Sequence, residues 1–406
     1  MISRRKLLQH MGAVPVAGSL LVLPKSLQPH LQPETGTSRD FFKELGVRTF
    51  INAAGTYTAL TGCMMHPNVV EAIEYASKQY VTLDEIQDKV GERIAELLHC
   101  EYATVTAGCF SAITLGTAGV ITGLDPKKAD QLPNDFTGLK SEVILQKSHR
   151  VGYDHAIKNT GAKIVEVETR EDLEKAINEN TAMMWFLNYH SNDGQIGPEE
   201  WVAIGKKHGI PTMNDCAADV PPVENLWKYT KMGFDLVCFS GGKGIRGPQS
   251  AGLLLGRKDL VKAARLSAPP RGSTIGRGMK VNKEEVLGML VALETYLSRD
   301  HEADWKLWEG QIKQINDSVA DIPGVETEIH VPEIANHVPS IRVRWDQEKI
   351  AMTPNEVRDA LRKGHPSIET VGGGESVDMT TWMLQAGEER IVGKRLAEIL
   401  TGAAKT

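Results

Sequence analysis

The stretch FDLVCFSGGKGIRGPQSAGLLLG, residues 234–256, organises the interpretation of this sequence. An apolar, β-prone run ends at Phe239, a glycine-rich turn presents Lys243, and a second apolar run begins at Ala251. This pattern predicts a lysine on a tight loop between two buried strands. Because burial disfavours a charged ammonium group, such a lysine is suited to losing its proton.

Lys243 is therefore predicted to form a Schiff base with pyridoxal 5'-phosphate and to act as general base. That cofactor needs an acid beside its pyridine nitrogen, so that the protonated ring can draw electrons from the substrate. Asp215 supplies this acid at the end of an apolar run that starts at Ile210. The two residues are 28 positions apart (243 − 215), which leaves room for another strand and helix between them.

A nucleotide-binding loop is the competing interpretation of the same stretch. Residues 242–247, GKGIRG, match the pattern G-x-G-x-x-G. That motif has to open a helix, whereas here Pro248 and an apolar strand pattern follow. The nucleotide interpretation is therefore rejected.

Repeated strand and helix patterns predict an α/β fold with a mostly parallel sheet covered by helices. Residues 39–278 are expected to form a large cofactor-binding domain. Residues 279–406 are expected to form an interdomain helix and a small C-terminal α+β domain. Strands are predicted at 102–106, 142–146, 163–167, 181–188, 210–215, 234–239, 251–255, 325–331 and 340–344, and helices at 66–81, 83–98, from 109, 151–159, 172–179, 199–208, 282–296, 301–319, 355–363 and 388–400.

Further residues are candidates for holding the cofactor. A strand that runs into a small-residue helix after Gly108 exposes backbone N–H groups, which suit a phosphate. The turn therefore assigns Gly108, Cys109 and Ser111 to the phosphate, and the Ser240 hydroxyl is a further candidate. His149 is predicted to stack on the pyridine ring, with a surface histidine as the alternative. Asn188 is predicted to bond the phenolic oxygen.

The N-terminus carries a pattern typical of twin-arginine export signals. Arg4 and Arg5 precede an apolar run at 11–23, which is shorter than the roughly 20 residues that a membrane-spanning helix needs. Residues 1–27 are therefore expected to be the signal and 28–38 a linker. The expectation is an exported, periplasmic protein without a stable membrane span, and a cytoplasmic protein is the alternative.

Composition excludes several other classes of protein. The 406 residues carry a formal net charge of −6, which gives no signal for binding nucleic acid. The five cysteines are odd in number and scattered, so neither a disulfide framework nor a metal site is expected.

Four stretches resemble the selenocysteine synthase-like (L-seryl-tRNA selenium transferase) family of pyridoxal enzymes, nearest the D-glucosaminate-6-phosphate ammonia-lyase branch. These are FSGGKGIRGPQSAG at 239–252, LGVRTFINAAGTY at 45–57, NDCAADVPP at 214–222 and IGRGMKVNKEE at 275–285. The resemblance implies an aspartate aminotransferase-like fold (fold type I) and the same roles for Lys243 and Asp215. It also implies a homodimer or higher homo-oligomer with interface active sites, which Arg277 and Lys280 of a neighbouring subunit could reach. Cys109 and Phe110 depart from the small residues usual in the phosphate turn.

The expected activity is that of a pyridoxal phosphate-dependent lyase. Its substrate would be a small amine, an amino acid or amino sugar acid, that loses its α-proton and then a leaving group. The alternatives are a selenium transferase-like transferase, or an aminotransferase or racemase on the same scaffold. Thr56, Tyr57 and Arg246 are candidate substrate residues, and arginines 342 and 344 are further candidates for the substrate carboxylate.

Overall fold

The computed structural model describes residues 39–405, which fall into two units, 39–48 and 49–405. The export signal and linker predicted for residues 1–38 lie outside the described residues. The first unit contains the short helix α2 (Phe41–Leu45), and Asp40 caps its start by accepting a hydrogen bond from the Lys43 amide at 3.0 Å. Everything that follows concerns the second unit.

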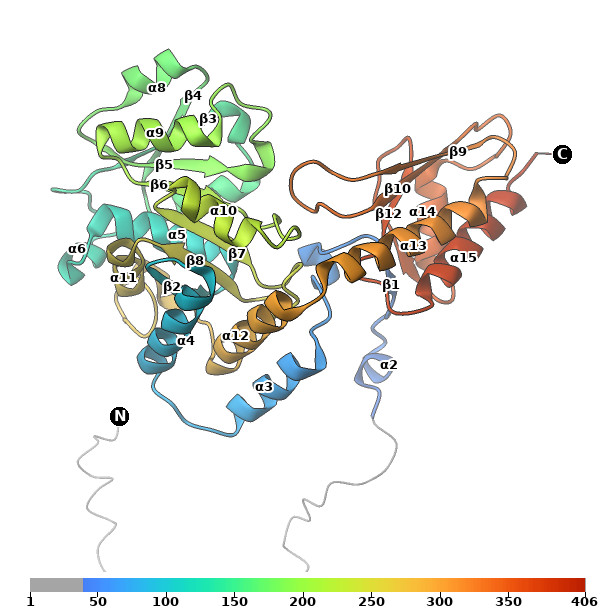
Figure 1. Ribbon diagram of the computed structural model, residues 1–406, viewed down its shortest axis with the longest axis horizontal. Helices are drawn as coiled ribbons and strands as arrows, with labels where there is room; N and C mark the ends of the chain where they lie inside the picture. Colours follow the sequence, from blue (N-terminus) through green and yellow to red (C-terminus); the bar gives the residue numbers. More distant parts are fainter. Residues whose placement is uncertain (1–38, 406) are drawn as a thin grey trace, which may run out of the picture. The chain divides into compact units, whose positions relative to one another are not determined.

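A seven-stranded sheet forms the centre of the large part of the second unit (Figure 1), with strand order β2-β8-β7-β6-β5-β3-β4. All neighbouring strands pair in parallel except β8, which is antiparallel to both β2 and β7. The prediction of a mostly parallel sheet is confirmed. Its strands are β2 (Tyr102–Thr106), β3 (Glu142–Gln146), β4 (Lys163–Val167), β5 (Thr181–Leu187), β6 (Thr212–Asp215), β7 (Leu236–Ser240) and β8 (Gly252–Gly256).

Two hydrophobic clusters cover the two faces of this sheet. Strand β5 shows the reason, because successive side chains of a strand point to opposite faces. Met184 and Phe186 belong to one cluster, whereas Met183 and Trp185 belong to the other. The helices of the large part are α3 (Pro67–Ser77), α4 (Leu83–Leu98), α5 (Gly108–Thr122), α6 (Pro126–Ala129), α7 (His155–Lys158), α8 (Arg170–Ala176), α9 (Pro198–His208), α10 (Asn225–Met232), α11 (Lys258–Leu266) and α12 (Lys283–Ser298).

The C-terminal part builds a separate core on an antiparallel sheet of order β12-β10-β9. A short parallel pair joins β1, near the start of the second unit, to β11. The elements are β1 (Ile51–Asn52), α13 (His301–Val319), β9 (Val325–His330), β10 (Ser340–Trp345), α14 (Pro354–Lys363), β11 (Ile368–Glu369), β12 (Val377–Thr380) and α15 (Glu388–Gly402).

Helices α12 and α13 follow each other directly between the two cores (Figure 1). Side chains of α12 up to Tyr296 pack in the core of the large sheet, whereas α13 enters the small core from Ile312 onward. The domain division at 278/279 remains a prediction. Among the described residues, no helix combines the length and the apolar character that crossing a membrane requires.

The structure differs from the predicted elements in a few places. Helix α3 ends at Ser77, not near Val81, and the exposed Tyr80 and Val81 have no packing to extend it. Helices α10 and α11 and the strands β1, β11 and β12 fall outside the predicted elements. The short strands escape prediction because they form only by pairing with distant partners.

Candidate active site

A cavity of about 560 Å³ opens at the carboxyl ends of the parallel strands. Leu187 at the end of β5 and Asp215 at the end of β6 line it, together with Lys243 from the loop after β7. The small C-terminal sheet supplies the opposite wall, with Arg342 on β10 and Asp378 on β12. Carboxyl ends of parallel strands are the usual place for a ligand in an open α/β sheet.

The loop that carries Lys243 is held tightly by its own backbone. Gly241 donates to the Ala251 carbonyl at 2.9 Å, and Gly247 donates to the Gly241 carbonyl at 2.8 Å. Gly244 lies so close to the next segment that an added methyl group would overlap the carbonyl oxygen of Val220. The glycines therefore allow the loop to press against its neighbours and fix the half-buried Lys243 at the cavity.

Asp215 is almost fully enclosed, with 4% of its surface exposed. Its Oδ1 accepts hydrogen bonds from the Ala217 amide at 3.1 Å and from the Cys238 thiol at 3.6 Å. Burial raises the pKa of this carboxyl, while the Ala217 hydrogen bond and the positive charge of Lys243 lower it. The structure thus brings the predicted amine and acid together in one cavity.

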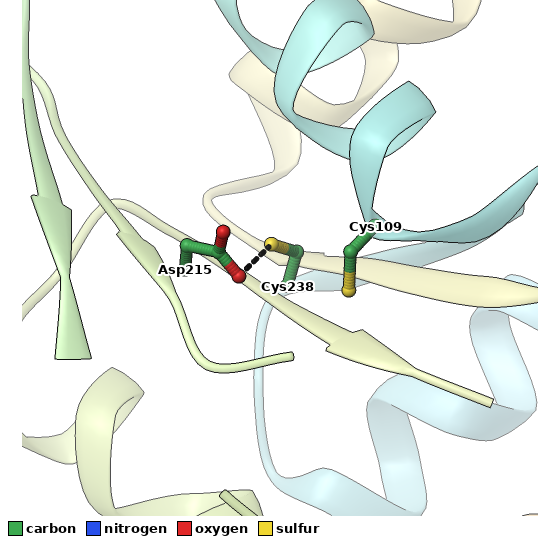
Figure 2. Close-up of side chains that lie close together, drawn as sticks. All are labelled: Cys109, Asp215 and Cys238. Atoms are coloured by element: carbon green, nitrogen blue, oxygen red, sulfur yellow. Dashed lines mark hydrogen bonds between the residues drawn. The ribbon is translucent and has the colours of Figure 1, made fainter. Parts of the chain in front are cut away.

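Two thiols lie near the Asp215 carboxyl, and Figure 2 shows Cys238 between Asp215 and Cys109. Cys109 comes from the start of α5 and Cys238 from β7, and the two sulfurs and a carboxylate oxygen lie within 4.8 Å of one another. The neighbouring Cys109 thiol and burial both raise the pKa of Cys238 well above its ordinary value. Cys238 is therefore a neutral donor to Asp215 at physiological pH, and all five cysteines are free thiols.

The predicted phosphate turn opens helix α5. Gly108 has a positive φ of 77°, and no side chain caps the first turn of the helix, so its backbone N–H groups are available to an anion. A methyl group on Gly252 would come within 2.6 Å of the Gly108 carbonyl carbon, which shows how closely β8 approaches the turn. Cys109 connects this turn to the cavity through its contact with Asp215.

This donor set fits pyridoxal phosphate. An amine and a buried carboxyl face one cavity, and a helix N-terminus with free N–H groups adjoins the carboxyl. Comparison with known proteins agrees: the sequence model described as "SelA: L-seryl-tRNA selenium transferase" matches residues 50–308, more than half of the chain.

The chain belongs to the L-seryl-tRNA selenium transferase family.

Individual relatives resemble the chain along most of its length. The D-glucosaminate-6-phosphate ammonia lyase of Salmonella typhimurium is 29% identical over 90% of this chain and 99% of its own. The 5'-C-glycyluridine monooxygenase-decarboxylase of a Streptomyces species is 28% identical over 92% of this chain and 95% of its own. A solved structure of D-glucosaminate-6-phosphate ammonia-lyase is 27% identical and superposes with a TM-score of 0.79, covering 91% of this chain and all of the other.

More distant structures share the fold alone. The serine palmitoyltransferase of Sphingomonas wittichii is 16% identical, with a TM-score of 0.56 over 88% of this chain and 89% of the other. The aspartate aminotransferase-like fold is therefore confirmed. Membership of the selenium transferase family also confirms that the chain is an enzyme and that pyridoxal phosphate is its cofactor. Among its relatives, a lyase is better supported than a transferase.

None of the other predicted cofactor residues lines the cavity, and their roles stay predictions. Ser111 is buried in α5, and Ser240 is half-buried at the end of β7; neither lines the cavity. His149 lies fully buried behind the cavity wall, where its Nδ1 accepts a hydrogen bond from the Leu187 amide at 3.2 Å. Burial lowers the pKa of His149 to about 4, so the ring is neutral at pH 7. Asn188 is buried and donates to the Tyr229 hydroxyl at 2.8 Å.

The predicted substrate residues divide into three groups. Thr56 and Tyr57 line the cavity, because the β1–β11 pair and a hydrogen bond from Thr380 to Ala53 hold their segment against the small sheet. Arg246 points elsewhere and donates to the Met64 carbonyl at 2.8 Å. The exposed Arg277 and Lys280 line a separate, open cavity of about 340 Å³.

Two charged cavity residues, Asp219 and Asp378, are absent from the sequence-based predictions, and Arg342 is one of several arginines predicted for the substrate carboxylate. Arg342 pairs with Asp378 at 3.2 Å and with Glu328 at 3.3 Å. Asp219 appears in the sequence as part of NDCAADVPP, four positions after Asp215. No local pattern distinguishes it from a turn residue, so only the tertiary structure reveals that it faces the cavity.

Proposed function

We propose that the protein is a pyridoxal phosphate-dependent lyase that eliminates a leaving group from a small amino acid or amino sugar acid. The observation that carries this proposal is the meeting of Lys243 and Asp215 in one cavity of a selenium transferase-family chain. Relatives that match nearly the whole chain are an ammonia lyase and a decarboxylase, and both names describe chemistry at an amine-bearing carbon.

The cofactor supplies an electron sink that stabilises negative charge on the substrate's α-carbon. The chain's own residues do the rest. Asp215 would hold the proton of the pyridine nitrogen, and the first turn of α5 would bind the phosphate through its N–H groups. Lys243 would anchor the cofactor and then accept the α-proton at Nζ. Arg342 lines the same cavity and is proposed to bind the substrate carboxylate, which requires its pairs with Asp378 and Glu328 to open.

Replacing Lys243 tests this proposal. We expect borohydride to fix the cofactor covalently to Lys243 in the wild-type protein. Lys243→Ala should lose this attachment, and its turnover should fall by at least about 100-fold. A panel of amino acids and amino sugar acids, scored for ammonia and keto-acid release, identifies the substrate. Lys231→Ala is the matched control, because Lys231 is exposed on α10 and does not line the cavity. Full turnover by Lys243→Ala would refute the proposal.

A homo-oligomer is proposed as the working form of the enzyme. Arg277 and Lys280 lie outside the cavity that holds Lys243, so they would act on a neighbouring subunit's site. Exposed apolar side chains at Tyr80 and Val81, the latter lining the same open cavity as Arg277, support an interface there. Export by the predicted twin-arginine signal likewise stays a proposal.

A further inference from the structure

The cavity contains a second buried carboxyl group, that of Asp219. Only 2% of this residue is exposed, and it lines the cavity together with Asp215 and Lys243. Its Oδ2 atom is buried and has no hydrogen-bond partner within the described chain. Because burial disfavours a charge, such a carboxyl favours its protonated, neutral form, in which it can donate a proton.

The backbone around Asp219 is fixed from three sides. The Asn225 side chain donates to the Asp219 carbonyl at 2.7 Å, and the Asn336 amide donates to the Ala218 carbonyl at 2.7 Å. On the third side, Gly244 of the lysine loop packs against the Val220 carbonyl. The lysine loop and the Asp219 segment are therefore packed together, and Lys243 and Asp219 line the same cavity.

The surroundings of Asp219 favour a carboxyl that can carry a proton near neutral pH. Burial and the negative charge of Asp215 raise its pKa to about 7, while Cys216, Asn188 and the positive Lys243 lower it. The Tyr229 hydroxyl from α10 also faces this carboxyl. A general acid works best when its pKa lies near the working pH.

Two of the other carboxyl and imidazole groups that line the cavity are engaged in pairs. Asp378 is paired with Arg342, and His190 is paired with Asp193 at 2.5 Å. His330 lies on β9 of the small sheet, and its Nδ1 has no partner within the described chain. His330 is therefore the competing donor that the experiment has to separate from Asp219.

We propose that Asp219 is the second acid–base residue of the site and protonates the departing group of the substrate. This inference rests on the proposed lyase function. For a β-hydroxy substrate, Lys243 takes the α-proton, and the electron pair of that bond becomes the second bond between Cα and Cβ. The Cβ–O bond breaks with its pair on oxygen, and the carboxyl proton of Asp219 completes a water molecule. Asp219 is left as a carboxylate and regains a proton from solvent, so the net change is loss of water without oxidation.

The leaving group of the substrate provides the test. The cofactor-loaded wild-type and Asp219→Asn enzymes are compared on D- and L-serine, whose hydroxide needs protonation, and on β-chloroalanine, whose chloride does not. We expect Asp219→Asn to lose about 100-fold or more in kcat with serine and less than about 3-fold with β-chloroalanine. In the wild type, kcat with serine should fall as the pH rises above about 7, because Asp219 loses its proton. The value of kcat with β-chloroalanine should not show this decrease.

Two readouts do not depend on turnover. The visible absorbance of the bound cofactor, and exchange of the serine α-proton in D₂O followed by NMR, should both persist in Asp219→Asn and be lost in Lys243→Ala. Asp219→Glu should recover part of the serine activity, and His330→Gln should retain it.

Each outcome decides the matter. If Asp219→Asn loses kcat equally on both substrates, or keeps full kcat with serine, the proposed role of Asp219 is refuted, while the proposed lyase function stands. If His330→Gln loses activity with serine and Asp219→Asn does not, the proton donor is His330 on β9 and not Asp219. If the wild type eliminates only chloride, the proposed acid step is refuted. If it acts on neither probe, the proposed lyase function fails on these substrates and the role of Asp219 fails with it.

Discussion

Asp215 and Asp219 lie four positions apart, face one cavity, and are both kept out of water. Burial raises the pKa of each, but their neighbours differ. Asp215 has a backbone amide and a thiol as donors, whereas Asp219 keeps one oxygen without a partner. The two carboxyl groups therefore have different hydrogen-bond surroundings, and such a difference can give two acids of one site different roles.

The raised pKa of Asp219 makes a prediction for stability. In the unfolded chain an aspartate has a pKa of about 3.9, and in the folded chain burial raises it to about 7. Between these values the folded state binds more protons, so this group's contribution to stability is fully present below pH 4 and is lost as pH rises through 7. The cofactor-free Asp219→Asn protein lacks this loss, and should be more stable than wild type at pH 8 by on the order of 4 kcal/mol.

Thermal or urea unfolding of both proteins at pH 4 and pH 8 measures this difference. The stabilisation by Asp219→Asn should shrink towards zero at pH 4. A difference that is the same at both pH values would show that the substitution acts through packing and not through the proton.

At the scale of elements, the lysine loop depends on glycine because other backbone segments lie against it. Gly244 faces the Val220 carbonyl, Gly242 faces the backbone of Gln249, and Gly241 faces Met289 and the Ala251 carbonyl. None of the three has a positive φ, so space is the constraint and not backbone conformation. Close packing around Lys243 therefore explains why these positions are glycine.

Gly244→Ala should displace this loop from the segment that follows Asp219. We expect the variant to fold less stably, by about 1–3 kcal/mol as for other overpacked sites, and to bind the cofactor at least about 10-fold more weakly. Gly272→Ala is the matched control, because nothing lies within 4 Å of the added methyl group and Gly272 has no positive φ. Cofactor titration followed by absorbance measures both variants. Equal affinities would mean that the loop accommodates the methyl group without moving Lys243.

At the scale of the whole second unit, the cavity assembles residues that are far apart in the chain. Thr56 and Tyr57 come from near its start, Asp215 and Lys243 from the central sheet, and Arg342 from the small sheet. Exposed Arg277 and Lys280 take no part in this cavity. The proposed oligomer gives them a role, since a neighbouring subunit could use them.

Subunit mixing tests that role. We expect Lys243→Ala and the double variant Arg277→Ala/Lys280→Ala each to be inactive, because each lacks one part of every site. Co-expressed, they should recover about a quarter of wild-type activity, since about half of the dimers would be hybrids with one complete site each. A mixture as inactive as its parents, with a dimer confirmed by light scattering, would place these two residues outside the neighbour's site.

The fold class and the pairing of a lysine loop with an acid at a strand end can both be predicted from the sequence. Apolar runs that end in one polar residue, and glycines around a lysine, are local consequences of the backbone environment and can be recognised without coordinates. The set of side chains that share the cavity becomes visible in the folded chain alone. Asp219, Arg342 and Thr56 converge through strand pairing over long separations, and the pKa of Asp219 is set by burial that distant residues provide. Desolvation is a property of the assembled fold, so no local sequence pattern predicts the raised pKa of Asp219.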